Sequence, residues 1–219
     1  MFIGHFALAF GAKKVAPKAS LGVLFLAAQL ADLVWPTLVL LGIEKVVVAP
    51  GITAVTPLDF VSYPYSHSLV ALIGWALALA IAYLLIRRGR PREAFVLALL
   101  VLSHWVLDAI SHRPDMPLAI GEGPKFGLGL WNSIPATLIV ESLLFAAGIA
   151  IYLKCTSAVD RIGKLALWAL VGFLAIVYVM NVFGSPPPGA VAVAWVCESL
   201  WILVAWAWWV DRHRRPIKE

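Results

Sequence analysis

Charge is what this sequence has least of. Only 13% of its 219 residues are Asp, Glu, Lys or Arg, whereas 62% are hydrophobic and the mean hydropathy is +0.92. So little polar surface cannot cover a water-soluble globule of this length, and the composition therefore excludes an ordinary soluble domain. We expect one integral membrane domain that comprises residues 1–219.

Cysteine is also scarce. The two cysteines, Cys155 and Cys197, lie in different segments and lack the spacing of metal ligands, which excludes a disulfide framework and a CxxC metal site. The leading segment MFIGHFALAFGAKK lacks the pattern of a cleavable signal peptide, because its charges follow the apolar run instead of preceding it. We expect it to remain in the mature chain.

Long apolar runs are abundant, and each predicts a helix that crosses a bilayer. A span requires about 20 mostly apolar residues. The runs that qualify cover residues 20–43, 66–86, 93–111, 132–153, 164–183 and 189–210. Lipid offers no water to an open strand edge, so these spans should be helical. The expected fold is an all-α polytopic bundle of about six transmembrane helices, with residues 1–12 as a short interfacial or half-membrane helix.

Lys and Arg predict the orientation of this bundle. With the N-terminus in the cytoplasm, only three of the 17 basic residues fall outside: Lys45, Arg113 and Lys125. The others fall inside: Lys13, Lys14, Lys18, Arg87, Arg88, Arg90, Arg92, Lys154, Arg161, Lys164, Arg212, Arg214, Arg215 and Lys218. By the positive-inside rule we expect an inner (plasma) membrane protein with both termini cytoplasmic and the loops 44–65 and 112–131 outside. Orientation thus accounts for the net charge of +5, and no nucleic-acid partner is required.

Ionisable residues inside the expected spans require a compensating partner. A charged side chain at the bilayer centre costs about 2.5 to 3.5 kcal/mol on insertion scales. The carboxylates concerned are Asp32, Asp108, Glu141 and Glu198, and the histidines in or beside apolar segments are His5, His67, His104 and His112. We expect these groups to be neutralised, paired or bound to a metal.

One stretch, SHWVLDAISHRPDMPL, suggests which of them meet. His104, Asp108 and His112 are spaced by four residues, which places them within an arc of about 80° on one helix face. Pro114 ends the helix near His112, so Asp115 reaches the same site only if the following loop folds back. Imidazoles and carboxylates in a dry bundle suit Zn²⁺ or a related divalent ion such as Mn²⁺. A structural hydrogen-bond network between helices is the alternative.

Several short motifs in residues 1–115 carry a family resemblance: GHFALAFG, AAQLADLVWP, YSHSL and LSHWVLDAI. With these the chain resembles the membrane-bound metal-dependent hydrolases, LexA-regulated inner-membrane proteins that also carry a domain-of-unknown-function label. The resemblance matches the family's metal-site positions with His5, Asp32, His67, His104 and Asp108.

The chain also departs from the family pattern. Gln29 and Leu30 replace the Pro and the first Asp of the second motif, and residues 62–64 replace the His-Arg-Gly that opens the third. The resemblance therefore implies a divergent member with fewer ligands, for which one metal ion is expected instead of two.

Hydrolysis, if it occurs, assigns roles to these residues. His67, His104 and Asp108 are the expected ligands together with His5 and Asp32, and one open position holds water. His112 completes the ligand set or acts as acid or base, and Asp115 and Glu141 are candidate bases. Trp131 and Asn132 would line a substrate entrance. The expected substrate is a lipid or lipid-linked phosphate ester in the outer leaflet.

Other functions and plainer roles stay open. Asp32, Asp108, Glu141 and Glu198 could instead form a proton or cation path, although no inverted repeat and no pair of Gly- or Pro-broken spans supports a transporter. A non-catalytic scaffold with a structural polar cluster is a third possibility. Glu141 and Glu198 could serve only as structural hydrogen-bond partners, Trp131 as an interfacial anchor and His5 as a packing residue.

Overall fold

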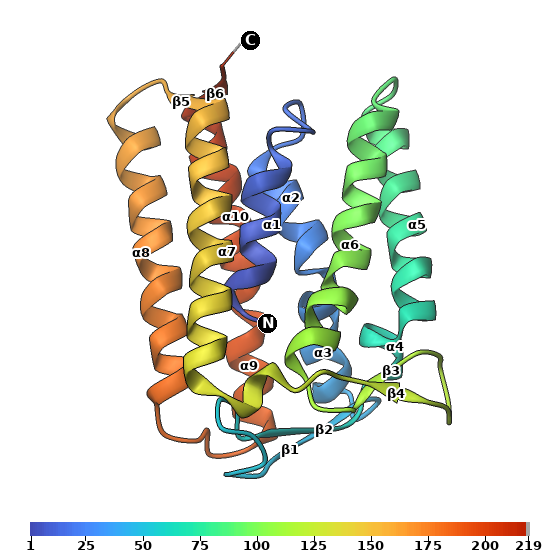
Figure 1. Ribbon diagram of the computed structural model, residues 1–219. Coiled ribbons are helices and arrows are strands. Elements are labelled where there is room, and N and C mark those ends of the chain that lie inside the picture. Colours follow the sequence, from blue (N-terminus) through green and yellow to red (C-terminus); the bar gives the residue numbers. More distant parts are fainter. Residues whose placement is uncertain (218–219) are drawn as a thin grey trace.

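The computed structural model describes residues 1–217 and confirms an all-α helical bundle (Figure 1). Its helices are α1 (Ile3–Ala12), α2 (Leu21–Ala28), α3 (Leu30–Leu40), α4 (Pro64–His67), α5 (Leu69–Ile86), α6 (Pro91–Ser111), α7 (Ile134–Cys155), α8 (Arg161–Phe183), α9 (Ala190–Glu198) and α10 (Leu200–Arg212). Within the described residues, five helices are long and apolar enough to cross a membrane, or six if the bent pair α2–α3 counts as one span.

Side-chain caps determine where several of these helices begin. Ser20, Ser68 and Ser133 accept hydrogen bonds from backbone N–H groups three residues later, at 3.3, 3.1 and 3.4 Å, at the starts of α2, α5 and α7. Asp160 caps α8 in the same way through Gly163 N at 2.9 Å. These caps satisfy N–H groups that have no partner within the helix.

The first predicted span is not one straight helix. Its two halves, α2 and α3, meet at Gln29 with a bend of 57°. Gln29 has φ −106° and ψ 10°, outside the helical region, and Pro36 lies inside α3. The sequence did not predict the bend, because the residue at the break is neither Gly nor Pro. The last predicted span is also divided, at Ser199, but Ser199 keeps helical dihedrals and residues 190–212 together are long and apolar enough for one span.

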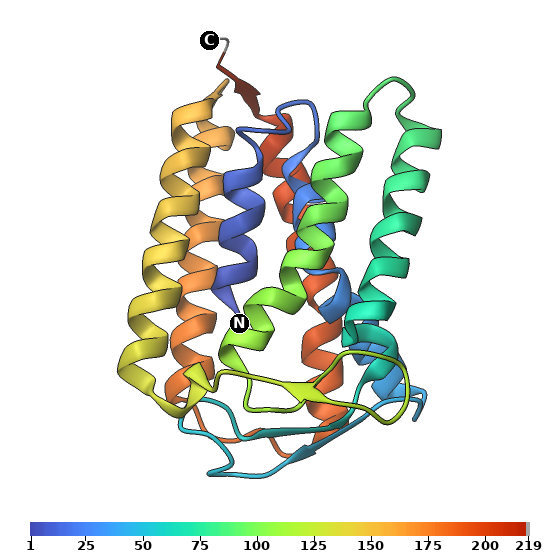
Figure 2. The ribbon, with the colours of Figure 1, turned by 45° about the vertical axis from the view of Figure 1, so that its right-hand side comes forward.

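The short helix α1 lies in the centre of the bundle. Most of its residues are buried, and it packs against α7, α2 and α6. Phe10 contacts Phe25, Phe145 and Tyr152 at ring-centroid distances of 5.1, 6.2 and 5.3 Å. The start of α1 lies partway along the neighbouring helices, as Figures 1 and 2 show. This burial agrees with the expectation that residues 1–12 form a short helix, interfacial or half-membrane, that is buried against the bundle.

The outer faces of the long helices are apolar. In each 18-residue spanning window only 17% to 44% of the residues are buried within the protein, and the exposed positions include many Leu, Ile, Val and Trp side chains. Soluble monomeric proteins rarely expose an apolar surface of this extent to water. The helices therefore fit a membrane protein.

The connections collect at two ends of the bundle (Figure 1). One end carries the antiparallel pairs β1 (Lys45–Val48) with β2 (Leu58–Ser62) and β3 (Met116–Pro117) with β4 (Lys125–Phe126), and the 3₁₀ turn η1 (Leu130–Asn132). The other carries the α1–α2 and α5–α6 connections and the pair β5 (Thr156–Ala158) with β6 (Arg214–Pro216). The described basic residues assigned above to the cytoplasm belong to this second end, while Lys218 lies outside the described residues.

Gly148 on α7 permits the close approach of α1. A Cβ at this position would collide with the backbone of Ala7, including its carbonyl oxygen. We expect Gly148→Ala to lower the free energy of unfolding by about 1–3 kcal/mol, the usual range for overpacking. Gly172→Ala on α8 is the matched control, because nothing lies within 4 Å of its Cβ position. Thermal unfolding in detergent measures both, and equal melting temperatures for the two variants would contradict close α1–α7 packing at this glycine.

Candidate metal centre

Histidine and aspartate side chains from separate helices converge near the end of the bundle that carries β1–β4. They are His5 on α1, Asp32 on α3, His67 on α4, His104 and Asp108 on α6, and His112 just after α6. Two overlapping groups, His5–His104–Asp108 and Asp32–His67–His104, each have one ligand atom per residue within 4.8 Å of the others. His104 belongs to both groups. The cluster could hold a metal ion.

Asp108 is at the centre of this cluster. Its Oδ1 lies 3.0 Å from His5 Nε2, and its Oδ2 lies 3.2 Å from His104 Nε2. His67 Nε2 and His112 Nε2 are 3.9 and 4.0 Å from the same Oδ2. Four imidazoles thus direct Nε2 toward one carboxylate. The backbone nitrogen of Met1 also contacts Asp108 Oδ1 and lies 3.0 Å from Ser111 Oγ.

Asp32 forms the second carboxylate of the cluster. Its Oδ1 is 3.4 Å from His67 Nε2 and 3.8 Å from His104 Nε2. The side chain of Asp32 is 30% exposed, whereas that of Asp108 is 4% exposed. Asp32 therefore lies where the buried cluster meets the protein surface.

Contacts to the opposite ring nitrogen orient three of the histidines. His104 Nδ1 lies 2.8 Å from the carbonyl oxygen of Ala28, at the bend between α2 and α3. His67 Nδ1 lies 2.7 Å from Ser66 Oγ, and His112 Nδ1 lies 2.9 Å from Asp115 Oδ1. Protein groups bound to the second nitrogen orient metal-binding histidines in this way. The arrangement leaves Nε2 of all three rings toward the centre of the cluster.

An unpaired nitrogen tests whether these residues suit a cation. His104 is fully buried, and despite its closeness to Asp108 its Nε2 makes no hydrogen bond with any group among residues 1–217. A buried polar atom without a partner costs about 1–3 kcal/mol, and such atoms are few in folded proteins. Coordination of a divalent ion by this nitrogen would remove the cost, so the residues fit a metal site.

The loop after α6 folds back and brings Asp115 to the edge of the cluster. Tyr63 Oη donates to Asp115 Oδ1 at 3.0 Å, and Arg113 Nε donates to Oδ2 at 3.0 Å. Burial raises the pKa of Tyr63, so its hydroxyl stays protonated and donates. Burial alone would raise the pKa of Asp115, but hydrogen bonds with His112, Tyr63 and Arg113 outweigh it and hold this pKa below its usual value.

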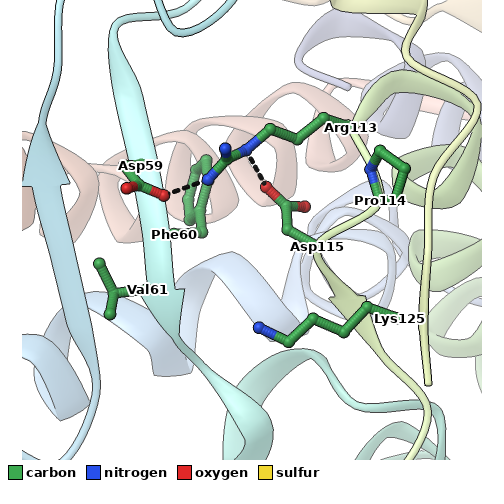
Figure 3. A pocket seen from close by; sticks show the side chains of 7 residues that line it. All are labelled: Asp59, Phe60, Val61, Arg113, Pro114, Asp115 and Lys125. Atoms are coloured by element: carbon green, nitrogen blue, oxygen red, sulfur yellow. Dashed lines mark hydrogen bonds and ion pairs between the residues drawn. The ribbon is translucent and has the colours of Figure 1, made fainter. Parts of the chain in front are cut away.

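A pocket of about 320 Å³ opens beside Asp115 (Figure 3). Its lining residues are Asp59, Phe60, Val61, Arg113, Pro114, Asp115 and Lys125. Arg113 is held between Asp59 and Asp115, as the dashed lines in Figure 3 mark. The pocket therefore combines two cationic side chains with a direct connection, through Asp115, to His112.

Aromatic side chains cover the same side of the cluster. Phe60 on β2 lies 4.9 Å from the ring of His112, 5.3 Å from Tyr63 and 5.5 Å from Trp35. The Trp131 ring, in η1, lies 4.3 Å from that of His112. The structure thus brings Trp131 to the site, while Asn132, the next residue, is exposed at the end of η1.

Glu141 and Glu198 have other contacts. Glu141 Oε2 accepts hydrogen bonds from Phe2 N at 2.9 Å and Gly4 N at 3.1 Å, so it caps the start of α1. Glu198 accepts a hydrogen bond from Thr37 Oγ1 at 2.5 Å, which joins α9 to α3. These contacts match the structural alternatives that the sequence left open for both residues.

Sequence reasoning assigned no role to three residues near the cluster. Tyr63 contacts His112, Ser66 contacts His67, and Glu44 contacts Ser66. Only a weak local signal existed for Ser66, which directly precedes His67. Tyr63 and Glu44 reach the site through the β1–β2 hairpin, and their positions in the sequence do not indicate this contact.

The fold and the cluster define a class: an apolar all-α bundle of the membrane type with a buried His–Asp group that could hold a metal ion. No family model matches the chain, and no curated protein or solved structure matches it either. The resemblance to the membrane-bound metal-dependent hydrolases therefore rests on the short motifs of residues 1–115 and stays a prediction.

His104 belongs to both candidate ligand groups, so its removal gives the strongest test of the site. We expect about one equivalent of zinc or manganese in the wild-type protein after mild chelation and gel filtration, and almost none in His104→Ala. His213→Ala is the control, since His213 lies at the opposite end of the bundle, where its Nδ1 is 2.7 Å from Asp160 Oδ2. Elemental analysis of folded protein measures the content, and an unchanged metal content in His104→Ala would remove His104 from the ligands.

Proposed function

We propose that this protein is a membrane-embedded, metal-dependent hydrolase of a lipid or lipid-linked phosphate ester. The observation that carries the proposal is the set of buried imidazoles whose Nε2 atoms face Asp108. The oriented Nδ1 contacts and the unpaired His104 Nε2 support a cation at this position. The family resemblance agrees with this reaction class.

In this proposal the ion, zinc or manganese, is held by His5, Asp32, His67, His104 and Asp108. When bound, such an ion supplies Lewis acidity that polarises a phosphoryl oxygen and lowers the pKa of water. Bound to Oδ1 of Asp115 through Nδ1, His112 presents Nε2 to the site and accepts the proton of the attacking water there. The Asp115 carboxylate then stabilises the imidazolium. Glu141 is a weaker candidate for the base, because it caps α1.

Lys125 in the pocket beside Asp115 supports an anionic substrate. Arg113 also lines the pocket but pairs with Asp59 and Asp115, so Lys125 is the cationic side chain that would attract a phosphate group. Phe60 also lines the pocket, and the Trp131 ring lies against His112 at a tilt, where an apolar part of a lipid would lie. By the positive-inside rule, this end of the bundle faces away from the cytoplasm, so the substrate is drawn from the outer leaflet of the inner membrane.

A proton or cation pathway is the second candidate function, and one observation favours it. The bent pair α2–α3 places Asp32 directly after a break in a span, and discontinuous helices form the ion sites of many transporters. Two observations argue against a pathway. The clustered polar groups lie toward one end of the bundle, and Glu198 accepts a hydrogen bond from Thr37. His112 contacts Asp115, and Asp115 contacts Arg113, beyond the proposed ion site. These contacts favour a hydrolase over an ion pathway.

Hydrolysis can be tested with phosphatidate in mixed micelles, measured as phosphate release in the presence of zinc or manganese. We expect His112→Gln to lower turnover by about 10²–10⁴-fold, the usual contribution of a general base, with metal content retained. His213→Ala should keep wild-type turnover. If the wild type releases no phosphate but carries ions across reconstituted vesicles, the pathway would be favoured instead.

The orientation can be tested by cysteine labelling in intact cells. In a Cys155→Ser, Cys197→Ala background, Gly123→Cys should react with an impermeant maleimide added from outside, because the loop 112–131 is expected there. Arg88→Cys, in the α5–α6 connection, should react only after the membrane is opened. The reverse pattern would invert the topology and move the substrate to the cytoplasmic leaflet.

A further inference from the structure

Glu44 is a buried carboxylate outside the spanning helices. It lies between α3 and β1 and is only 2% exposed. Its Oε1 accepts hydrogen bonds from Tyr65 N at 2.7 Å and Ser66 N at 2.9 Å, and its Oε2 accepts one from Ser66 Oγ at 2.6 Å. The two backbone N–H groups can only donate, and the Ser66 hydroxyl donates to the second carboxylate oxygen.

These bonds fix the direction of the next one. A serine hydroxyl has one proton to donate, and Ser66 gives it to Glu44. The contact of 2.7 Å between Ser66 Oγ and His67 Nδ1 must then have the ring as donor. A neutral His67 then carries its proton on Nδ1, and its Nε2 presents a lone pair toward Asp32 and Asp108.

We propose that Glu44 and Ser66 are positioning residues that set the tautomer of His67 and so make its Nε2 able to bind the ion. The proposal rests on the metal site of the proposed function. A backbone carbonyl orients His104 and a carboxylate orients His112, whereas His67 depends on two side chains in series. Groups of this kind, beyond the ligands, typically contribute 10- to 100-fold to metal affinity.

Glu44 could be argued to serve only as a cap for the short turn of α4, and Glu44→Gln separates the two roles. The backbone N–H groups of Tyr65 and Ser66 require an oxygen, so the amide NH₂ of the glutamine must face Ser66 Oγ. Ser66 then accepts from this NH₂ and donates to His67 Nδ1, which moves the ring proton to Nε2. The cap survives in this variant, but the direction of the hydrogen-bond chain is reversed.

The experiment compares zinc affinity, by competition with a chelator, for the detergent-solubilised wild type, Glu44→Gln, Ser66→Ala and Ser68→Ala. We expect affinity to fall 10- to 100-fold in Glu44→Gln and by less in Ser66→Ala, where His67 can keep its proton on Nδ1. Ser68→Ala is the matched control, because Ser68 lies in the same turn but caps α5 through Ala71 N at 3.1 Å. It should bind zinc as the wild type does.

A second measurement does not depend on zinc. Nitrogen NMR of the metal-free protein labelled at histidine, with His67→Ala to assign the signal, should show the proton on Nδ1 in the wild type and on Nε2 in Glu44→Gln. A wild type that binds zinc, with Glu44→Gln unchanged in affinity and tautomer, would overturn the relay. A wild type without zinc would overturn the metal site, and the NMR comparison would still decide whether Glu44 sets the tautomer.

Discussion

A carboxylate buried among apolar helices must be compensated, and Asp108 imposes this requirement on much of the structure. In a low-dielectric interior an unpaired charge of this kind costs several kcal/mol. The bundle surrounds it with imidazoles from α1, α4, α6 and the start of the following loop, which all turn Nε2 toward Asp108. This grouping gathers the nitrogen and oxygen donors that a divalent ion prefers, and a bound cation would offset the charge of Asp108.

Irregular backbone brings into the cluster groups that continuous helices would not place there. The bend at Gln29 leaves the Ala28 carbonyl free to contact His104, and it turns Asp32 toward the cluster. The short helix α4, which ends at His67, places that ring against Ser66, which Glu44 holds in turn, before the long helix α5 begins. Such departures are tolerated at membrane depth where protein surrounds them.

The fold was predictable because composition and apolar run length are properties of the chain itself, and these predicted the helices and their approximate ends. The i, i+4, i+8 spacing likewise predicted the shared face of His104, Asp108 and His112. The bend at Gln29 was not predictable, because no Gly or Pro lies at the break. Glu44 remained hidden, since its contact with Ser66 depends on how the β1–β2 hairpin closes. Whether Asp115 joined the site depended on a loop whose path the sequence left open.

The central position of α1 has a consequence for the biogenesis of the protein. Chains enter the membrane from their N-terminal end, yet α1 is enclosed by α6 and α7, which are made later. Residues 3–12 can therefore complete their packing only after α7 has been made. Glu141 can cap α1 only at that stage, whereas His5 can reach Asp108 as soon as α6 is in place. The candidate ligands all lie in residues 1–108, so this set of donors can gather once α6 is in place and before α7 encloses it.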